Sequence, residues 1–156
     1  MATSQEDVLY QKASHYCSYQ ERTEKEVQEK LYAWGVTKKS VIACIIQALK
    51  ADRFLDEERY VVAFIRSKFL GKQWGKIKIR TMLTKKGLDQ SLIQKGFLMI
   101  TDADYLQSLR HIAERKKQLL DGATQIQKQQ KLIRYLLQKG YEPSLVHQVV
   151  QTTITQ

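Results

Sequence analysis

The sequence predicts an all-α protein, built as an elongated array of three tandem three-helix repeats. Apolar residues recur with helical spacing along nearly the whole chain, and no stretch alternates with period 2 long enough to indicate a sheet. One pattern also occurs three times: an aliphatic residue, a leucine four positions later, and a glycine after four more. The glycines, Gly35, Gly87 and Gly140, are 52 and 53 positions apart (87 − 35 and 140 − 87). A period of this length is typical of repeat architectures, and it divides the chain into predicted repeats at 1–53, 54–101 and 102–156.

The first helix of each repeat is predicted from an amphipathic pattern. In the first repeat, Leu9, Ala13, Tyr16 and Cys17 fall on one helical face. In the second, Asp56 precedes two further acidic residues, so it can cap a helix and place carboxylates at the positive end of the helix dipole. The predicted ranges are 6–20, 56–70 and 102–120.

The second helix of each repeat ends at the repeated glycine. Only glycine enters the left-handed conformation after a helix without a steric penalty, so Gly35, Gly87 and Gly140 are predicted to be helix stops. In the first repeat, the run from Thr23 to Glu26 is typical of a capping box at a helix start. The predicted ranges are 24–34, 75–86 and 125–139.

The third helix of each repeat follows the glycine after a short turn. Ile42, Ile45, Ile46 and Leu49 have the spacing of one buried face. Asp89 and the pair formed by Glu142 and Pro143 suit helix starts in the later repeats. The predicted ranges are 38–51, 90–100 and 144–154.

Composition favours a cytoplasmic protein with packed cores. The chain has 156 residues, 43% of them hydrophobic, which argues against disorder. The apolar runs are far shorter than the roughly 20 residues of a membrane span, so no membrane association is expected. The polar, acidic start lacks the features of a secretory signal. Cys17 and Cys44 lie in apolar periodic runs and are expected to be buried thiols.

Catalytic chemistry finds little support in the sequence. The chain has no glycine-rich phosphate loop, no His-x-x-x-His pair and no Cys-x-x-Cys pair. His15, His111 and His147 are far apart in sequence and are expected at surface or boundary positions. We therefore predict that the protein is not an enzyme and has no catalytic residues, no metal site and no cofactor.

The net charge of +10 is unevenly distributed. Residues 1–58 contain 8 Lys/Arg and 10 Asp/Glu, a balance of −2, whereas residues 59–156 contain 18 Lys/Arg and 6 Asp/Glu, a balance of +12. Such an excess indicates a polyanionic partner, most simply nucleic acid, although a basic surface that only promotes solubility is the alternative.

The densest basic segment runs from Arg59 to Leu88 and contains no acidic residue. Lys76 and Arg80 are four positions apart and should share one side of the predicted helix, where like charges repel unless an anion is nearby. Trp74, just before this helix, can stack on a base or pack against the protein. The nine basic residues of the segment are Arg59, Arg66, Lys68, Lys72, Lys76, Lys78, Arg80, Lys85 and Lys86.

A second basic set lies in the third repeat. It begins with Arg110, and the run from Arg115 to Lys117 can also be explained as a plain helix terminus, where cations are favoured. We predict that the basic segment and the rest of this set bind nucleic acid or an acidic protein surface. The predicted residues of the second set are Arg115, Lys116, Lys117, Lys128, Lys131 and Arg134.

The central segment resembles the RecX family, regulators of the bacterial recombinase RecA. The resembling residues are Phe54 to Arg66, Trp74 to Ile79, Leu83, and Lys86 to Leu88, and the block from Arg22 to Gly35 is similar to the first module of the family. The likeness covers roughly residues 8 to 153. It implies three tandem three-helix modules. It also implies binding to the RecA filament and to single- and double-stranded DNA, with suppression of ATP hydrolysis and strand exchange.

Two other functions remain open from the sequence. A free-standing DNA-binding protein would need a recognition helix with base-reading residues near its start, and the starts at Lys38, Gln90 and Ser144 do not provide a convincing one. A protein-binding adaptor would use the basic faces against an acidic partner. In each case the chain is expected to be a monomer.

Overall fold

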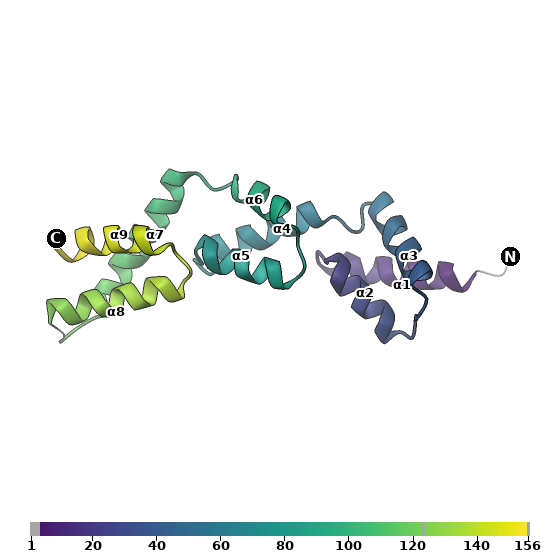
Figure 1. Cartoon of the computed structure of the whole chain (residues 1–156), viewed down its shortest axis with the longest axis horizontal. Helices are drawn as coiled ribbons and strands as arrows, with labels where there is room; N and C mark the ends of the chain where they lie inside the picture. The colour runs from purple at the N-terminus through teal and green to yellow at the C-terminus, as the bar shows by residue number, and fades with distance from the viewer. Residues whose placement is uncertain (1–3, 123, 156) are drawn as a thin grey trace.

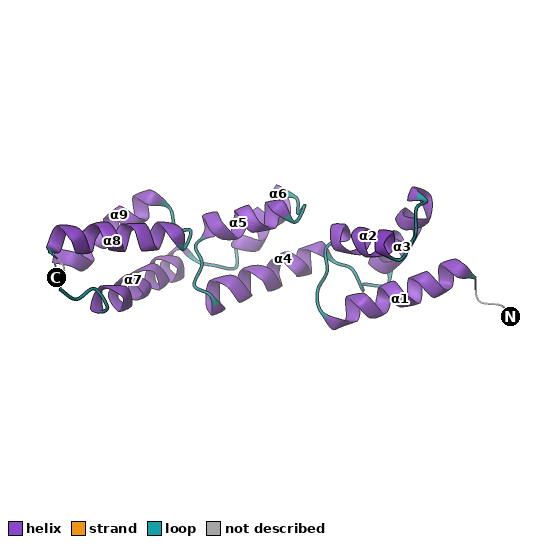
Figure 2. Ribbon diagram, turned by 90° about the horizontal axis from the view of Figure 1, so that it is seen from below, coloured by secondary structure: helices purple, strands orange, loops and turns teal. Residues whose placement is uncertain are grey.

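The computed structural model describes residues 4–122 and 124–155, and every regular element in them is helical. The described residues form nine α-helices and one short π-helical turn. The α-helices fall into three successive groups of three, and Figures 1 and 2 show these groups following one another in a row from the N-terminus to the C-terminus. The predicted fold class, an elongated all-α array of three-helix repeats, is confirmed.

The first repeat contains α1 (Gln5–Tyr19), α2 (Glu24–Ala33) and α3 (Lys39–Ala51). The predicted capping box at the start of α2 forms only in part. The Thr23 hydroxyl accepts a hydrogen bond from the Glu26 N–H at 3.0 Å, as expected. The Glu26 carboxylate, however, faces side chains of the second repeat instead of turning back to the backbone. A complete capping box occurs at α1, between Ser4 and Asp7.

The second repeat contains α4 (Glu57–Arg66), the π-helical turn η1 (Ser67–Gly71), α5 (Lys76–Lys85) and α6 (Gln90–Phe97). The helix predicted at 56–70 is therefore α4 continued by the wider η1 turn. Asp56 caps α4 as predicted, since its carboxylate accepts the Arg59 N–H at 3.1 Å. Helix α6 ends three residues before the predicted boundary at 100, and Ile100 packs into the core from the turn that follows.

The third repeat contains α7 (Asp102–Gln118), α8 (Gln125–Gln138) and α9 (Pro143–Thr155). All three repeated glycines have the left-handed backbone that the sequence predicted, with φ of 91° at Gly35, 85° at Gly87 and 97° at Gly140. Each lies two residues after the last residue of a repeat's second helix, with one capping residue between. They are helix stops, as predicted.

The apolar cores do not follow the three repeats one to one. The first repeat has a core of its own, centred on Leu31 and Leu49. The second and third repeats share one continuous core, which runs from Val61 and Ile65 to Leu136 and Val149. The second and third repeats are therefore one packed unit, whereas the first repeat is packed separately.

The two cysteines have different surroundings. Cys17 is buried in the first core, as predicted, and burial raises the pKa of its thiol. Cys44 is exposed, so the prediction of a second buried thiol is wrong. It lies on α3 beside the core residues Ile45 and Ile46 but points away from them. In residues 4–122 and 124–155, no helix has the length and apolar character needed to cross a membrane.

Candidate nucleic-acid interface

The basic helix α5 begins directly against the third repeat. The Gly75 N–H donates to the Lys139 carbonyl at 2.7 Å, and the Ile77 N–H donates to the Gly140 carbonyl at 3.0 Å. The Lys76 N–H donates to the Tyr105 hydroxyl at 2.9 Å. The first N–H groups of a helix have no partner within the helix. Here the end of α8 and the start of α7 supply three hydrogen-bond acceptors for them. These bonds hold α5 in a fixed position relative to the third repeat.

Aromatic rings fill the joint beneath α5. The ring centroids of Phe69 and Tyr105 are 6.0 Å apart, and those of Tyr105 and Tyr141 are 5.1 Å apart. The Tyr105 hydroxyl donates to the Glu142 carboxylate at 2.8 Å, and the Tyr141 hydroxyl donates to the Gln73 carbonyl at 3.3 Å. Burial raises the pKa of Tyr141 to about 12 and also raises that of Tyr105. Both tyrosines are therefore neutral hydrogen-bond donors at physiological pH.

Three lysines of the second repeat lie over two aromatic rings. The Lys68 and Lys78 ammonium groups lie 5.0 and 4.4 Å from the centroid of Trp74. Lys68 and Lys86 lie 5.4 and 5.9 Å from the centroid of Phe64. We call Phe64, Lys68, Trp74, Lys78 and Lys86 the cation–aromatic strip. Trp74 is half-buried and packs against the shared core, so the interpretation of Trp74 as a packing residue is confirmed, and two cations lie beside its ring.

The opposite side of α5 carries two further cations. Lys76 and Arg80 lie 5.9 and 5.3 Å from the centroid of Phe97. They therefore share a side of the helix, as their spacing predicted. Lys76 also lies 4.6 Å from the ring of Tyr105. Its aliphatic stem thus covers apolar surface while its charge stays at the surface.

The basic surface continues across the joint into the third repeat. The Lys139 ammonium group donates to the Lys72 carbonyl at 3.2 Å and lies 5.7 Å from the Tyr135 ring. Lys116 lies 4.6 Å from the same ring. Arg115 and Lys116 line a cavity of about 290 Å³, which Gln73 of the second repeat also borders. The fold thus brings Lys72 and Lys116, distant in sequence, to one joint, and adds Lys139, which sequence reasoning missed.

Two predicted site residues are occupied by contacts within the protein. The Arg59 side chain lies 2.6 Å from the Glu21 carboxylate and also donates to the Arg53 carbonyl at 3.0 Å. Glu21 raises the pKa of Arg59. The Lys117 ammonium group donates to the Thr153 carbonyl at 2.7 Å. Arg59 therefore joins the first two repeats, and Lys117 joins α7 to α9.

The remaining predicted cations lie apart from the strip. Arg66 is exposed at the end of α4, and Lys85 is exposed at the end of α5. The other three project from α8, where no acidic side chain occurs: Lys128, Lys131 and Arg134.

A polar contact joins the first repeat to the second. The Glu26 carboxylate accepts from the Tyr60 hydroxyl at 3.4 Å and lies 3.9 Å from the Lys86 ammonium group. The Glu57 carboxylate accepts from the Glu24 N–H at 3.4 Å, and burial raises the pKa of Glu57. Together with the pair of Arg59 and Glu21, these contacts are ionic or polar. Leu55, at the start of the second repeat, packs into the first core, but the first repeat shares no continuous core with the second as the third does.

The first repeat has a cation–aromatic cluster that sequence reasoning also missed. Arg22 lies 3.8 Å from the Tyr16 ring, and Lys12 lies 4.8 Å from the Trp34 ring. Lys30 lies within 6 Å of both rings. These residues are scattered through a segment of net negative charge, so charge counting gave no signal. The helical spacing of Lys12 and Tyr16, and of Lys30 and Trp34, was the only available sequence signal.

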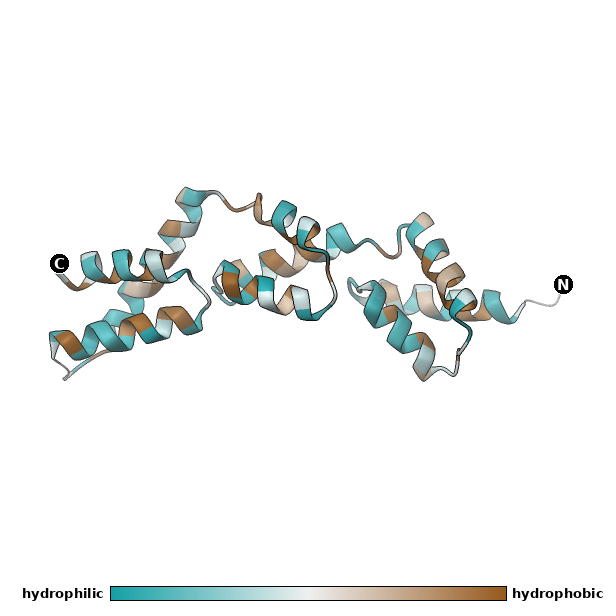
Figure 3. Cartoon of the chain, in the orientation of Figure 1, coloured by the Kyte–Doolittle hydropathy of each residue, from teal (hydrophilic) through white to brown (hydrophobic). Residues whose placement is uncertain are grey.

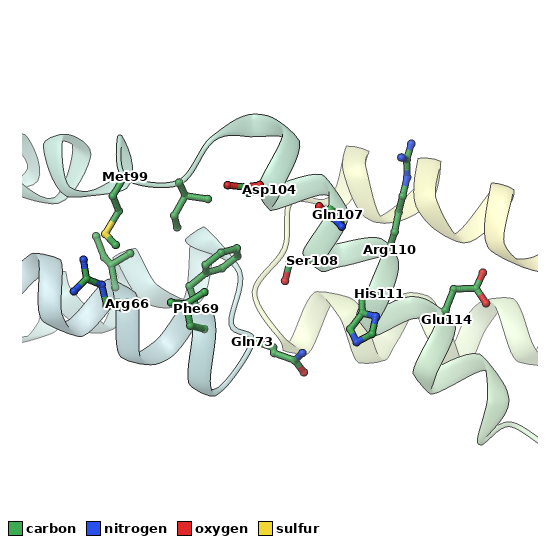
Figure 4. A pocket seen from close by; sticks show the side chains of 13 residues that line it. Arg66, Phe69, Gln73, Met99, Asp104, Gln107, Ser108, Arg110, His111 and Glu114 are labelled. Carbon is green, nitrogen blue, oxygen red and sulfur yellow. The ribbon is translucent and has the colours of Figure 1, made fainter.

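A groove of about 650 Å³ opens on another side of the joint (Figure 4). Its second-repeat wall carries Arg66, Phe69 and Met99, and the facing wall is a polar face of α7 that includes Asp104 and His111. His15, His111 and His147 are all exposed, as predicted. Over residues 4–122 and 124–155, no three His, Cys, Asp or Glu side chains gather as a metal-binding group. The groove is lined by apolar side chains of the second repeat and polar side chains of the third.

Comparison with known proteins identifies the same three units. Models for the RecX family match in order: the first three-helix domain over residues 10–47, the second over 56–96 and the third over 102–150. The regulatory protein RecX of Clostridium botulinum is 32% identical over 137 residues, which cover 85% of this chain and 62% of the relative. The regulatory protein RecX of Bacillus cytotoxicus is 28% identical over 137 residues, which cover 88% of this chain and 50% of the relative.

The fold also matches solved structures. The crystal structure of RecX from Lactobacillus salivarius superposes with a TM-score of 0.87 at 25% identity, over 97% of both chains. A second crystal structure, of a regulatory protein RecX, superposes with a TM-score of 0.84 at 22% identity, over 94% of this chain and 73% of the other. The chain spans about half the length of the first curated relatives it matches. Because three domain models follow its three repeats in order, the chain belongs to the RecX family.

Proposed function

We propose that this protein regulates RecA by binding the RecA–DNA filament and inhibiting its ATPase, strand exchange and recombination. The observation that carries the proposal is the cation–aromatic strip on the packed unit of the second and third repeats, in a chain of the RecX family. The protein acts as a cytoplasmic monomer, and its ligands are the filament and its single- or double-stranded DNA.

The arrangement of the repeats suits a long, charged partner. Lysines over aromatic rings keep their charge at the surface, where they can neutralise phosphates and release counterions. The α5–α8 joint holds the cations of two repeats in a fixed geometry, so a second contact becomes intramolecular once the first has formed. Modest individual affinities then combine into slow dissociation. A clamp of this kind resists the RecA movements that accompany ATP turnover and filament growth.

The direct test is RecA ATPase activity on single-stranded DNA, with and without substoichiometric protein. We expect suppression well below one protein per RecA protomer, since one bound chain contacts more than one protomer. Charge reversal of Lys76 and Arg80 together should weaken inhibition and lower its salt sensitivity. An unchanged ATPase rate with the wild-type chain would overturn the proposal.

Binding to bare DNA separates this function from the other two. Strong binding to single-stranded DNA without RecA would favour a free-standing DNA-binding protein. Binding seen only with the RecA filament supports the proposed regulator. Binding to RecA alone, without DNA, would favour a protein adaptor. Fluorescence anisotropy with labelled oligonucleotide, measured over a range of salt concentrations, distinguishes these outcomes.

A further inference from the structure

A cavity of about 290 Å³ lies where the second repeat meets the third, and we call it the joint cavity. Gln73, from the segment after η1, forms one side, and its carbonyl accepts from the Tyr141 hydroxyl at 3.3 Å. The C-terminal half of α7 and Tyr135 of α8 form the rest. In Figure 3, hydrophobic and hydrophilic bands alternate along α8, the helix that supplies Tyr135. Because both repeats supply its walls, the joint cavity exists only while they are packed together.

Three cations surround the joint cavity. Arg115 and Lys116 line it. The ammonium groups of Lys116 and Lys139 lie 4.6 and 5.7 Å from the centroid of the same Tyr135 ring. In the described part of the chain, no acidic side chain lines the cavity, and none of the three cations forms an ion pair with a carboxylate. Like charges gathered in this way repel one another unless an anion is bound.

Neutralisation of helix ends accounts for only part of this positive charge. Helices α7 and α8 and the η1 turn all end at the joint, and the Lys139 ammonium group donates to the Lys72 carbonyl at the end of η1. A helix carries roughly −0.5 of a charge at its C-terminus, so three ends carry about −1.5 in total. The three cations therefore leave an excess of roughly one and a half positive charges at the joint cavity.

The rest of the lining indicates an organic ligand instead of a bare anion. Ile112 and Leu119 offer apolar surface, and Gln73 and Gln118 offer amide groups, which both donate and accept hydrogen bonds. Amide side chains pair with the edges of nucleobases in this way. The volume lies at the lower end of the range for small-molecule sites, so it suits a base and sugar with the phosphates at the basic rim.

The placement of the cations separates a free nucleotide from a nucleic-acid strand. A strand carries one negative charge per nucleotide, spread along its length. A nucleoside di- or triphosphate instead gathers several charges in one place, as Lys116 and Lys139 are gathered around one ring. The arrangement therefore favours the free nucleotide.

We propose that the joint cavity binds a nucleoside di- or triphosphate. Arg115, Lys116 and Lys139 hold the phosphates, and Gln73 and Gln118 contact the edge of the base. The proposal goes beyond the RecA-regulatory function. It does not depend on that function, since the joint cavity lies in the isolated chain and shares no residue with the cation–aromatic strip.

The test measures nucleotide binding to the full chain by isothermal titration calorimetry, without RecA and at low salt. The ligands are ATP and ADP, and the controls are adenosine, which lacks the phosphates, and pyrophosphate, which lacks the base. The first variant is Lys116→Gln with Lys139→Gln. Its matched control is Lys38→Gln with Lys39→Gln, which removes the same charge from exposed positions of the first repeat. A second variant, Gln118→Ala, tests the contact with the base.

We expect ATP and ADP to bind more tightly than either adenosine or pyrophosphate. The change of Lys116 and Lys139 should weaken ATP binding at least about tenfold, because two charge-assisted contacts are lost. The control pair should leave ATP binding within about twofold of the wild type, since its charges are distant and screened. Gln118→Ala should weaken ATP binding and leave pyrophosphate binding unchanged. Circular dichroism should show unaltered helix content in each variant, since none of the changed side chains is buried.

Several results would overturn the proposal. One is the absence of binding by both nucleotides, and another is pyrophosphate binding as tight as that of ADP, which would show a site for phosphate alone. Full ATP binding by either test variant would place the nucleotide elsewhere. Binding of a single-stranded oligonucleotide that Lys116→Gln with Lys139→Gln weakens, while free ATP does not bind, would assign the joint cavity to nucleic acid. None of these results involves RecA, so the proposed regulatory function is tested separately.

Discussion

At the scale of single residues, the same kind of basic side chain has several different roles. Lys68 and Lys78 lie over Trp74 with their charges at the surface, whereas Arg59 and Lys117 are held by partners within the protein. Sequence spacing correctly placed Lys76 and Arg80 on one side of their helix, because positions four apart on a helix are neighbours. Sequence spacing could not show which cations bind other parts of the protein, because the partners of Arg59 and Lys117 are distant in sequence.

The two lysines at Trp74 provide the first prediction. Changing Lys68 and Lys78 to glutamine should lower the slope of log affinity against log salt by about 1.4, since each single-strand phosphate contact contributes about 0.7. The fold should be preserved because glutamine keeps the first half of the aliphatic stem and both side chains lie at the rim of the core. The measurement is filament binding between low and moderate salt. Lys38→Gln, at an exposed position in the first repeat, is the control, and an equal change in both variants would contradict the prediction.

Tyr141 provides a second residue-scale prediction, on stability at high pH. Burial raises its pKa from 10.0 to about 12. The folded state therefore holds this proton more tightly than the unfolded state. The stabilisation of the folded state by the protonated Tyr141 hydroxyl is complete below pH 10 and is lost as the pH rises toward 12. The shift corresponds to roughly 2–3 kcal/mol of unfolding free energy.

Urea unfolding measured from pH 8 upward should therefore show a steep loss of stability above pH 10. In Tyr141→Phe the loss of unfolding free energy above pH 10 should be smaller, because the Tyr141 hydroxyl no longer titrates. Tyr19→Phe, where the ring is 72% exposed, should retain the wild-type pH dependence. Parallel curves for the wild type and Tyr141→Phe would show that Tyr141 is not the cause.

At the scale of elements, the decisive contact is the end of α8 against the start of α5. The end of α8 was predicted from the glycine stop, and α5 begins one residue after the start of its predicted range of 75–86. The contact between these two ends was not predicted, because two helix ends 65 residues apart (140 − 75) give no common pattern in the sequence. The same is true of Glu26. Its sequence position suits a capping box, but its carboxylate instead contacts Tyr60 and lies near Lys86.

Gly75 provides the prediction at this scale. A methyl group there would collide with the Gly140 carbonyl oxygen. Its φ of −80° is one that alanine adopts freely, so any effect of Gly75→Ala comes from the collision alone. We expect a loss of about 1–3 kcal/mol in unfolding free energy. Gly71→Ala, where a methyl group would meet nothing within 4 Å, should change stability by less than about 1 kcal/mol.

At the scale of the whole molecule, the array is stiff at one joint and weakly held at the other. The second and third repeats share a core. The first repeat is joined to them through the pair of Glu21 and Arg59 and through polar contacts of Glu26. Exposed ion pairs contribute at most about 1 kcal/mol and are screened by salt. The first repeat should therefore change its orientation more readily than the others.

Single-molecule energy transfer can measure this difference between the joints. A dye pair on Cys44 and a cysteine introduced at Gln94 reports on the first joint. A pair at Gln94 and Gln148, with Cys44→Ser, reports on the second. Raising the salt concentration should broaden the distance distribution of the first pair and leave the second unchanged. Equal broadening of both pairs would contradict the separate packing of the first repeat.

Local patterns in the sequence are enough to assign the helices, their order, the glycine stops and the charge asymmetry. These features arise from interactions within a few residues: the helical period, the capping of chain ends and the steric freedom of glycine. Tertiary contacts decide which repeats share a core, which cations remain at the surface and where Lys139 lies. Each of these depends on contacts between residues far apart in the chain, and local patterns carry no information about them.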